Sequence, residues 1–235
     1  MGEKMLRQIE KIMQSQTTEE LRRVLEEVIG YYNVPYFLYG IRIPQVNKQP
    51  KDMVINLYPN GWMEHYYKEN YIQVDSVLHY SLSNNLPTIW RDDLFSTSSK
   101  MREESKDAGM EFGASFPIHS ATGEKGIFSI ASPHEKDINA NIFMLVSALL
   151  PYIHEKFKEL EKEVMYPKLP VLSDREKDVL AWSAIGKTAY ETACIMGNIA
   201  EATVVFHLKA AMKKLNCKTQ RQAIALALQH RLIQI

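Results

Sequence analysis

Residues 172–188 read LSDREKDVLAWSAIGKT, and residues 202–216 read ATVVFHLKAAMKKLN. Ser173, followed three residues later by Glu176, forms the pattern of a capping box that starts a helix, and Gly186 marks the end of that helix. The sequence predicts four short helices, over residues 175–184, 188–196, 201–215 and 219–230. Because a glycine turn separates the second from the third, this part is expected to be a helix-turn-helix unit.

The charge of the chain is balanced overall, with 28 basic and 28 acidic residues, but it is not evenly distributed. From Val171 to the end there are 9 basic and 5 acidic residues, so this part carries +4 and the remainder −4. Lys209, Lys213 and Lys214 lie on the third expected helix, where their cations can meet phosphates. A basic C-terminal part therefore indicates nucleic acid as its partner.

A proline-containing segment separates this unit from the rest of the chain. Residues 166–170 read YPKLP, and two prolines within four residues disfavour both helix and sheet. The expected organisation is therefore a first domain over 1–165, a linker over 166–171 and a second domain over 172–235.

The first 165 residues are expected to form helices that flank a small sheet. Apolar residues at helical spacing predict helices over 5–29 (with a new start at Thr17), 62–70, 75–83, 101–108 and 141–164. Runs rich in Ile, Val, Phe and Tyr predict strands over 36–43, 53–58, 114–119 and 126–131. The expected fold class is α+β: an N-terminal α/β/α sandwich with a mostly antiparallel sheet, followed by an all-α four-helix domain.

Several classes of protein are disfavoured by what the sequence lacks. The two cysteines, Cys194 and Cys217, form neither a disulfide framework nor a metal motif. No apolar run reaches the length of a membrane span, and the N-terminus has no signal-peptide pattern, so a cytoplasmic location without membrane contact is expected. Residues 113–117 begin like a nucleophile elbow but lack its closing glycine, and with no phosphate-binding loop or metal-ligand pattern we expect no enzyme.

The C-terminal stretch resembles the DNA-binding domain shared by LuxR-type and NarL-type transcription regulators. The positions that match its pattern are Glu176, Leu180, Gly186, Lys187, Thr188, Thr203, Val204, His207, Lys213 and Leu215. The resemblance implies that DNA is contacted by Lys187, Thr188, Thr203, Val205, His207, Lys209 and Lys213. One departure is Ala200, which stands where the family often has a capping Ser or Thr, and another is that Ala202 and Val205 cannot make bidentate base contacts.

The N-terminal part resembles the signal-binding domain of LuxR-type quorum-sensing receptors, which hold N-acyl-homoserine lactones. The resemblance rests on residues 58–76, YPNGWMEHYYKENYIQVDS, and on Pro87-Thr88-Ile89-Trp90 further along. It implies a ligand site formed by Tyr58, Trp62, Tyr66, Asp75, Trp90 and Ser129, with Gly113 also matching the pattern. One departure is Ser76, where the family usually has proline after the aspartate.

The chemistry of these side chains suits such a lactone. The Trp62 indole N–H can donate to the lactone carbonyl, and the Asp75 carboxylate can accept the amide N–H. Tyr66 and Ser129 can donate to the acyl carbonyl, while Tyr58 would act directly or through water. Trp90 would form a wall beside the lactone ring.

The resemblance implies a regulator that binds an acyl-homoserine lactone, needs no cofactor or metal, and binds promoter DNA as a homodimer. A dimer is also expected because the apolar stripe over 141–164 needs a partner and a symmetric operator needs two reading heads. The alternative is a signal-independent DNA-binding module whose first domain dimerises or binds a different signal. Acyl length, operator and the sign of regulation are open at this point.

Overall fold

The computed structural model describes residues 2–43, 50–120, 123–165, 171–230 and 232–234. The chain divides into two units, Met1–Met165 and Tyr166–Ile235, and each is described by itself. The expected linker over 166–171 lies outside the described residues except for Val171. Within the described ranges, no helix is both long and apolar enough to cross a bilayer.

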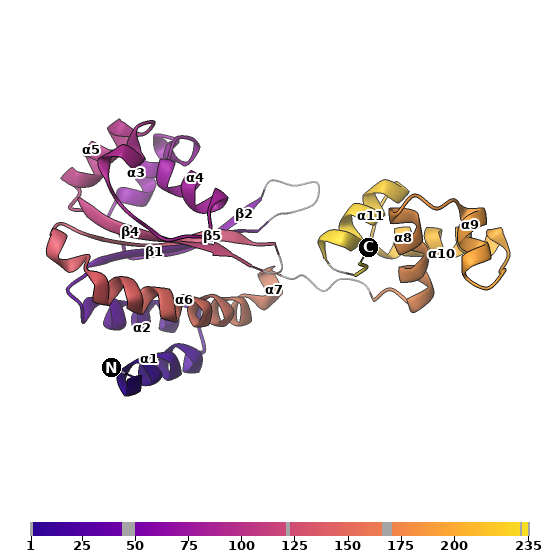
Figure 1. Ribbon diagram of the computed structural model, residues 1–235, viewed down its shortest axis with the longest axis horizontal. Coiled ribbons are helices and arrows are strands. Elements are labelled where there is room, and N and C mark those ends of the chain that lie inside the picture. The colour runs from indigo at the N-terminus through magenta and orange to yellow at the C-terminus, as the bar shows by residue number, and fades with distance from the viewer. Residues whose placement is uncertain (1, 44–49, 121–122, 166–170, 231, 235) are drawn as a thin grey trace. The chain divides into compact units, whose positions relative to one another are not determined.

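A five-stranded antiparallel sheet forms the centre of the N-terminal unit (Figure 1). Its order is β2-β1-β5-β4-β3, and its strands are β1 (Tyr36–Ile43), β2 (Lys51–Asn56), β3 (Thr88–Ile89), β4 (Phe112–His119) and β5 (Lys125–Ser132). The four expected strands are confirmed, although β2 begins two residues earlier than expected and ends at Asn56. The sequence did not reveal β3, because two residues are too few to show an alternating pattern.

Three short helices cover one face of the sheet: α3 (Trp62–Lys68), α4 (Ser76–Ser83) and α5 (Ser99–Asp107) (Figure 1). The 3₁₀ turns η1 (Tyr71–Gln73) and η2 (Asp92–Phe95) connect them, and η3 (Glu135–Asp137) follows the sheet. Helix α3 is shorter than expected because Asn70 adopts a left-handed conformation, with φ of 55°, that starts η1. Helix α4 begins after Asp75, which serves as its N-cap.

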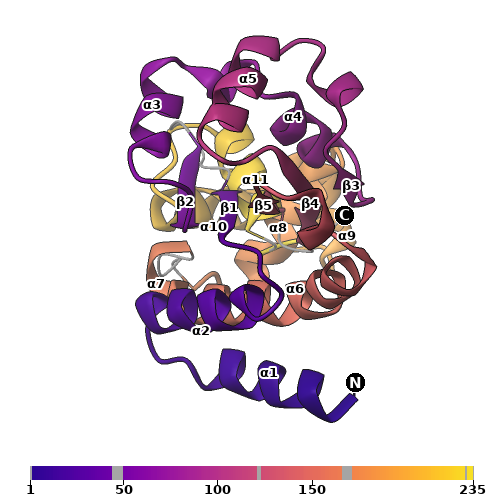
Figure 2. The same cartoon turned by 90° about the vertical axis from the view of Figure 1, so that its left-hand side faces the viewer.

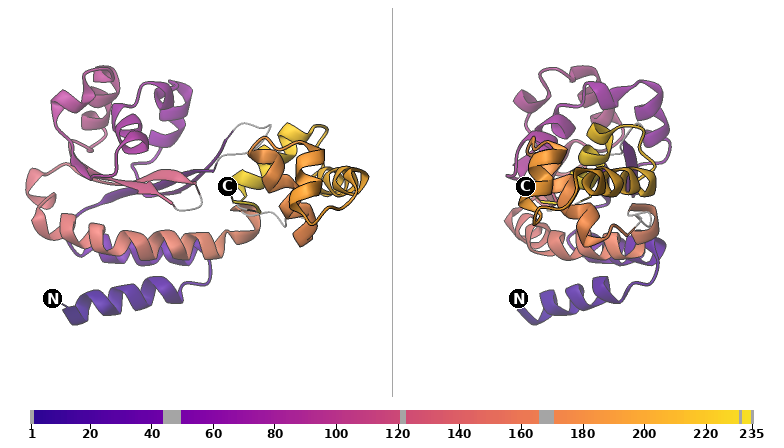
Figure 3. Two further views of the ribbon diagram at one scale, coloured as in Figure 1. Left: turned by 45° about the vertical axis from the view of Figure 1, so that its right-hand side comes forward. Right: turned by 90° about the vertical axis from the view of Figure 1, so that its right-hand side faces the viewer.

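The opposite face of the sheet is covered by α2 (Thr18–Gly30) and α6 (Ala140–Leu160), as Figures 2 and 3 show. Helix α1 (Gly2–Gln14) packs outside them against α6, and the expected new start after it is confirmed, because the Thr17 side chain caps α2. The helix expected over 141–164 is divided at Glu161 into α6 and α7 (Lys162–Met165).

The apolar stripe of α6 is buried inside the unit. Five of its members are at most 1% exposed: Ile142, Val146, Leu149, Ile153 and Phe157. Leu160, at the end of α6, is half-buried. The five buried side chains share this core with the aromatic side chains of the sheet, where the hydroxyl of Tyr39 hydrogen-bonds Nδ1 of His154 over 2.8 Å. The expectation that this stripe needs a second chain is therefore wrong, because the sheet already covers it.

Within its described residues the C-terminal unit contains four helices, which confirms the expected fold: α8 (Asp174–Ala184), α9 (Ala189–Ile195), α10 (Glu201–Lys214) and α11 (Gln220–Gln229). Capping boxes start α8 at Ser173 and α9 at Thr188. Gly186 and Gly197 both have positive φ, which glycine adopts without a steric penalty at the ends of helices. Helix α10 has no side-chain cap at Ala200, as its sequence implied.

Glu176 connects the start of α8 to the end of α10. Its carboxylate accepts from the backbone N–H of Ser173 and from Nζ of Lys214, both over 2.8 Å, and the residue is 5% exposed. Burial acts to raise the pKa of Glu176, but the bonds from Lys214 and Ser173 outweigh it and hold this pKa below its usual value. The ionised carboxylate therefore stabilises the folded unit.

We predict that Glu176→Gln lowers the local unfolding free energy of α8 and α10 by about 1 kcal/mol at pH 7, because the amide keeps the cap but loses the charge. Because the folded pKa is depressed, this contribution is present above the unfolded pKa and disappears as the pH falls through the folded pKa. Native-state hydrogen exchange measures the difference. Glu191→Gln, at the exposed box of α9, is the matched control, and an equal loss there would contradict the role of burial.

Candidate functional site

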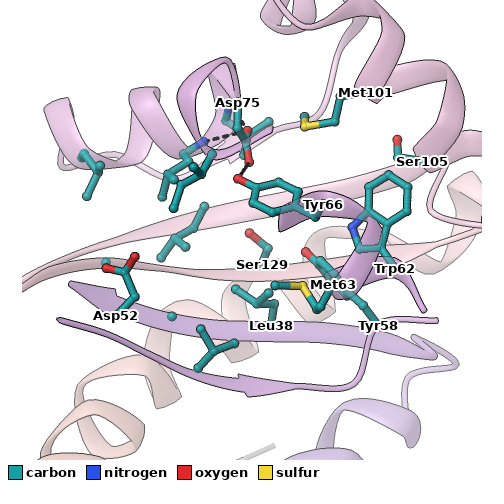
Figure 4. A pocket seen from close by; sticks show the side chains of 18 of the residues that line it. Leu38, Asp52, Tyr58, Trp62, Met63, Tyr66, Asp75, Met101, Ser105 and Ser129 are labelled. Atoms are coloured by element: carbon teal, nitrogen blue, oxygen red, sulfur yellow. Dashed lines mark hydrogen bonds between the residues drawn. The ribbon is translucent and has the colours of Figure 1, made fainter. Parts of the chain in front are cut away.

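A cavity lies between the sheet and the layer formed by α3, α4 and α5 (Figure 4). It contains about 920 Å³ of non-protein space, counting its open mouth. All six side chains expected to bind a signal line it: Tyr58, Trp62, Tyr66, Asp75, Trp90 and Ser129. The fold thus brings together residues that span more than seventy positions of sequence.

Asp75 and Tyr66 form the polar centre of the cavity. Oδ1 of Asp75 accepts from the backbone N–H groups of Val77 and Leu78, at 2.9 and 3.0 Å, and so caps α4. Its Oδ2 accepts from the Tyr66 hydroxyl over 2.9 Å, as the dashed line to Tyr66 in Figure 4 shows. Burial raises the pKa of Asp75 although these donors oppose the shift, and burial together with Asp75 raises the pKa of Tyr66.

Trp62 and Tyr58 lie at one end of the cavity. Trp62 is the first residue of α3 and is 8% exposed. Its indole nitrogen lies on the side of the ring that faces Tyr66, and no acceptor for its N–H is found among the described residues (Figure 4). Burial raises the pKa of Tyr58, and a hydrogen bond with Ser129 partly offsets this, so the phenol stays protonated. This end of the cavity therefore offers donors to a ligand.

A chain of hydrogen bonds joins Trp90, Ser115 and Ser129 in the wall of the cavity. The Trp90 indole N–H donates to the hydroxyl of Ser115 over 2.8 Å, and Ser115 hydrogen-bonds Ser129 over 2.8 Å. Gly113 makes room for this arrangement, because a Cβ there would lie 2.6 Å from the Trp90 ring. Trp90 can thus wall the cavity with its ring, but its N–H is already used. Ser115, in the motif that resembles a nucleophile elbow, is held within β4 by the same bonds.

Apolar side chains complete the lining, several of which the sequence did not single out. They are Leu38, Val54, Met63, Ile72, Val77, Leu78, Leu82, Phe95, Met101, Met110 and Ile127. The unbranched methionines come from three separate segments, so no local pattern could have assigned them to one wall. Methionine fills irregular space and adapts to flexible ligands.

A charged end was also missed. Nε and Nη2 of Arg42 donate to the two carboxylate oxygens of Asp52, both over 2.8 Å. Asp52 lies across the cavity from Trp62 in Figure 4, and Lys125 lines the same region. The strand alternation places Leu38, Gly40 and Arg42 on one face, which is a signal that could have revealed this pair.

Ser76 does not line the cavity. Its hydroxyl hydrogen-bonds the hydroxyls of Thr97, over 2.8 Å, and Ser98, over 2.9 Å. Ser76 is the first residue of α4, a position that proline also suits, and it ties α4 to the start of α5. Serine in place of the family's usual proline at this position therefore affects how α4 is held, but not which side chains line the cavity.

The residues expected to contact DNA lie either directly before α9 or on α10, the two helices of the helix-turn-helix. Lys187 and Thr188 precede α9, where Thr188 is its N-cap, and the others lie on α10: Thr203, Val205, His207, Lys209 and Lys213. Lys209 and Lys213 are exposed, whereas Thr203, Val205 and His207 are half-buried. Nζ of Lys214 donates to the carboxylate of Glu176 and to the carbonyl of Val171, so this cation already has partners within the unit.

Phe206 is a residue of this surface that sequence reasoning missed. It is 66% exposed, and its ring contacts that of His207 edge-on at 5.5 Å. Because Val204 and Ala211 point into the core, helical spacing directs Phe206, Lys209 and Lys213 to the outer face of α10. That face therefore combines two cations with one exposed aromatic ring.

Two family models match the chain in the order that the resemblance implied. The autoinducer binding domain matches residues 17–157, and the model of bacterial regulatory proteins of the luxR family matches residues 170–227. These families consist of transcription regulators, so the chain is not an enzyme.

Similar proteins cover almost the whole chain. The transcriptional activator protein VanR of Vibrio anguillarum is 32% identical, over 96% of this chain and 95% of its own. The quorum-sensing regulator RhlR of Pseudomonas aeruginosa is 30% identical, over 87% and 86%. The crystal structure of Escherichia coli SdiA has a TM-score of 0.82 at 27% identity and covers 99% of this chain and 98% of SdiA. This protein therefore belongs to the LuxR family of quorum-sensing transcriptional regulators, with an autoinducer-binding domain followed by a helix-turn-helix domain.

Proposed function

We propose that this protein binds an N-acyl-homoserine lactone and, as a homodimer in the cytoplasm, binds promoter DNA to control transcription. The observation that carries the proposal is the Tyr66–Asp75 pair, which lies between a donor-rich end and an apolar wall. The ligand class has the same order of groups: a lactone carbonyl, an amide and an alkyl tail.

An amide can satisfy both partners of the Tyr66–Asp75 bond at once. When the ligand's N–H donates to Oδ2 of Asp75, it replaces the Tyr66 hydroxyl there. Tyr66 is then free to donate to the acyl carbonyl, because its O–H has only one proton. The free N–H of Trp62 suits the lactone carbonyl, and the ring of Trp90 lines the same cavity.

Ligand binding of this kind is coupled to folding. A ligand that binds only the folded N-terminal unit stabilises it by RT ln(1 + [L]/Kd), about 4 kcal/mol at a thousandfold excess over Kd. Such a contribution is a large part of the stability of a small domain. The concentration of the lactone thereby sets the amount of folded regulator.

We predict that Asp75→Asn lowers lactone affinity at least about tenfold, because a charge-assisted hydrogen bond contributes about 1.5–3 kcal/mol and the new amide presents a donor to a donor. Asparagine still caps α4, so the fold is expected to persist. The measurement is the rise in thermal midpoint with lactone concentration for the full chain. Asp107→Asn, on the exposed end of α5, is the control. An unchanged dose–response in Asp75→Asn would remove this carboxylate from the site.

The same measurement separates the proposal from a signal-independent module. Wild-type protein that shows no shift with any lactone, while already folded, would support a first domain that serves another signal or dimerisation alone. A saturating shift with one lactone supports the receptor.

The outer face of α10 supports DNA binding. Lys209 and Lys213 can meet phosphates, and Val205 can contact a thymine methyl. Phosphate contacts account for most of the affinity and for its dependence on salt. Base selection is then left to the few side chains near the start of α10.

We predict that Lys209→Ala weakens binding to a duplex selected from random sequences and lowers the slope of log K against log salt by about 1. The loss is expected to be similar on unrelated duplexes, because phosphates carry no sequence information. Fluorescence anisotropy at several salt concentrations measures both. Lys177→Ala, on α8, is the control, and a slope that stays the same in Lys209→Ala would exclude a phosphate contact.

A different face of α6 from the one first expected supports the proposed homodimer. Met144 and Tyr152 are 61% and 42% exposed, and Pro151 and Glu155 share their side of the helix at helical spacing. Exposed apolar residues on one face of a helix are typical of a contact between subunits. Two copies are also what a symmetric operator requires.

We predict that Tyr152→Glu converts the ligand-bound dimer to a monomer, because the carboxylate would be buried without a partner. Sedimentation velocity measures the change. Leu86→Glu, at an equally apolar exposed position before β3, is expected to leave the dimer intact. Dimers that persist in Tyr152→Glu would show that another surface joins the subunits.

A further inference from the structure

The floor of the cavity consists of successive rows of the sheet. Ser129 on β5 pairs with Leu38 on β1, and two residues further along Ile127 pairs with Gly40. Since alternate residues of a strand face the same side, these rows all face the cavity. The first row is polar at Ser129. The second row is apolar and leaves more space above the sheet, because Gly40 has no side chain.

The third row is charged. Lys125 pairs with Arg42, and Arg42 pairs with Asp52 on β2. We name Asp52, Arg42 and Lys125 the charged row. The guanidinium of Arg42 binds the Asp52 carboxylate through two hydrogen bonds of 2.8 Å, a geometry that fixes both groups.

The end of α4 meets the charged row from above. Nζ of Lys125 donates to the carbonyl of Leu82 over 3.1 Å. On the neighbouring strand, Nε2 of His119 hydrogen-bonds the carbonyl of Ser81 over 2.8 Å. These contacts hold the C-terminal end of α4 at the charged row, while its N-cap, Asp75, stands at the polar centre. The apolar part of the cavity therefore has two defined ends.

Its length follows from the geometry of both elements. Ser129 and Lys125 are four residues apart on β5, about 13 Å along a strand. Asp75 and Leu82 are seven residues apart on α4, about 10 Å along a helix. Subtracting a contact distance of about 4 Å leaves about 6–9 Å for an alkyl tail. An extended chain advances about 1.25 Å per carbon, given bonds of about 1.5 Å and angles near 111°, so five to seven carbons fit beyond the carbonyl.

We propose that the charged row is the length determinant of this site and selects acyl-homoserine lactones whose acyl groups have about six to eight carbons, the carbonyl carbon included. The proposal rests on the proposed function and names the ligand class within it. A shorter tail leaves apolar lining without contact. A longer tail places methylene groups against Arg42 and Asp52, where they gain no apolar contact and displace water from two charged groups.

The test is a binding series with the full chain and unsubstituted lactones of four to twelve acyl carbons, followed by isothermal titration or thermal midpoint. Each buried methylene is expected to raise the affinity about fourfold up to the length limit. Beyond eight carbons the affinity is expected to stay level or fall. An affinity that rises steadily to twelve carbons would overturn the proposed limit while leaving the lactone receptor intact.

Two variants of the pair and one control complete the test. Arg42→Leu combined with Asp52→Leu removes the charges, and the optimum is expected to move to ten or twelve carbons, with at least a tenfold gain for the longest tail. Arg42→Asp combined with Asp52→Arg restores a pair in the opposite order and is expected to keep the wild-type optimum. Arg22→Leu combined with Glu26→Leu removes an ion pair from the surface of α2 and is expected to change nothing.

The outcomes separate the two proposals. An unchanged optimum in the folded double-leucine variant overturns the role of the charged row, even if the lactone receptor stands. Absence of binding at every length in the wild type overturns the lactone receptor itself, and the length limit with it.

Discussion

The carboxylate of Asp75 is the interaction on which the signal-binding domain depends. One of its oxygens caps α4, and the other holds the hydroxyl of Tyr66 on α3. Two helices of the layer above the sheet are thereby fixed at the place where the proposed ligand would bind. The same oxygen that holds Tyr66 is the acceptor that an amide would use. Structural support and the proposed ligand recognition would therefore share one group, so a cap and a binding residue are compatible readings of this position.

One face of the sheet forms the core of the domain, and the other forms the floor of the cavity. Phe37, Tyr39 and Phe128 pack against α2 and α6 and provide a core without solvent. The residues between them, Leu38 and Ser129, face the cavity instead. Because strand residues alternate, each strand contributes to both faces, and a rigid core directly supports the floor of the site. The rows of that floor pass from polar to apolar to charged. The first two suit the polar head and the alkyl tail of the proposed lactone, and the charged row would lie beyond the end of the tail.

In the C-terminal unit too, the side chains divide between internal contacts and an outer surface. Glu176 joins α8 to α10 through Lys214, so a cation that the sequence offers for phosphate contact is used internally. The outer face of α10 presents Lys209, Lys213 and Phe206. The exposure of Phe206 became evident only in the folded unit. A surface of two cations and one ring suits a duplex, since its affinity comes from phosphates and its contacts to bases from a few side chains.

Local sequence patterns determined most of the helices and four of the five strands, because caps and periodicity are properties of neighbouring residues. The resemblance to LuxR-type receptors, and no local pattern, grouped the six cavity residues in one set. Local patterns did not determine β3, the methionines of the wall, the charged row or the use of Lys214, since each depends on segments that meet only in the folded chain. The stripe of α6 shows the same limit: its period predicts an apolar face, but only the tertiary structure decides that the sheet of the same chain covers it. Helical periodicity predicts which face of a helix is buried, but only the packing of the folded chain shows which element covers that face.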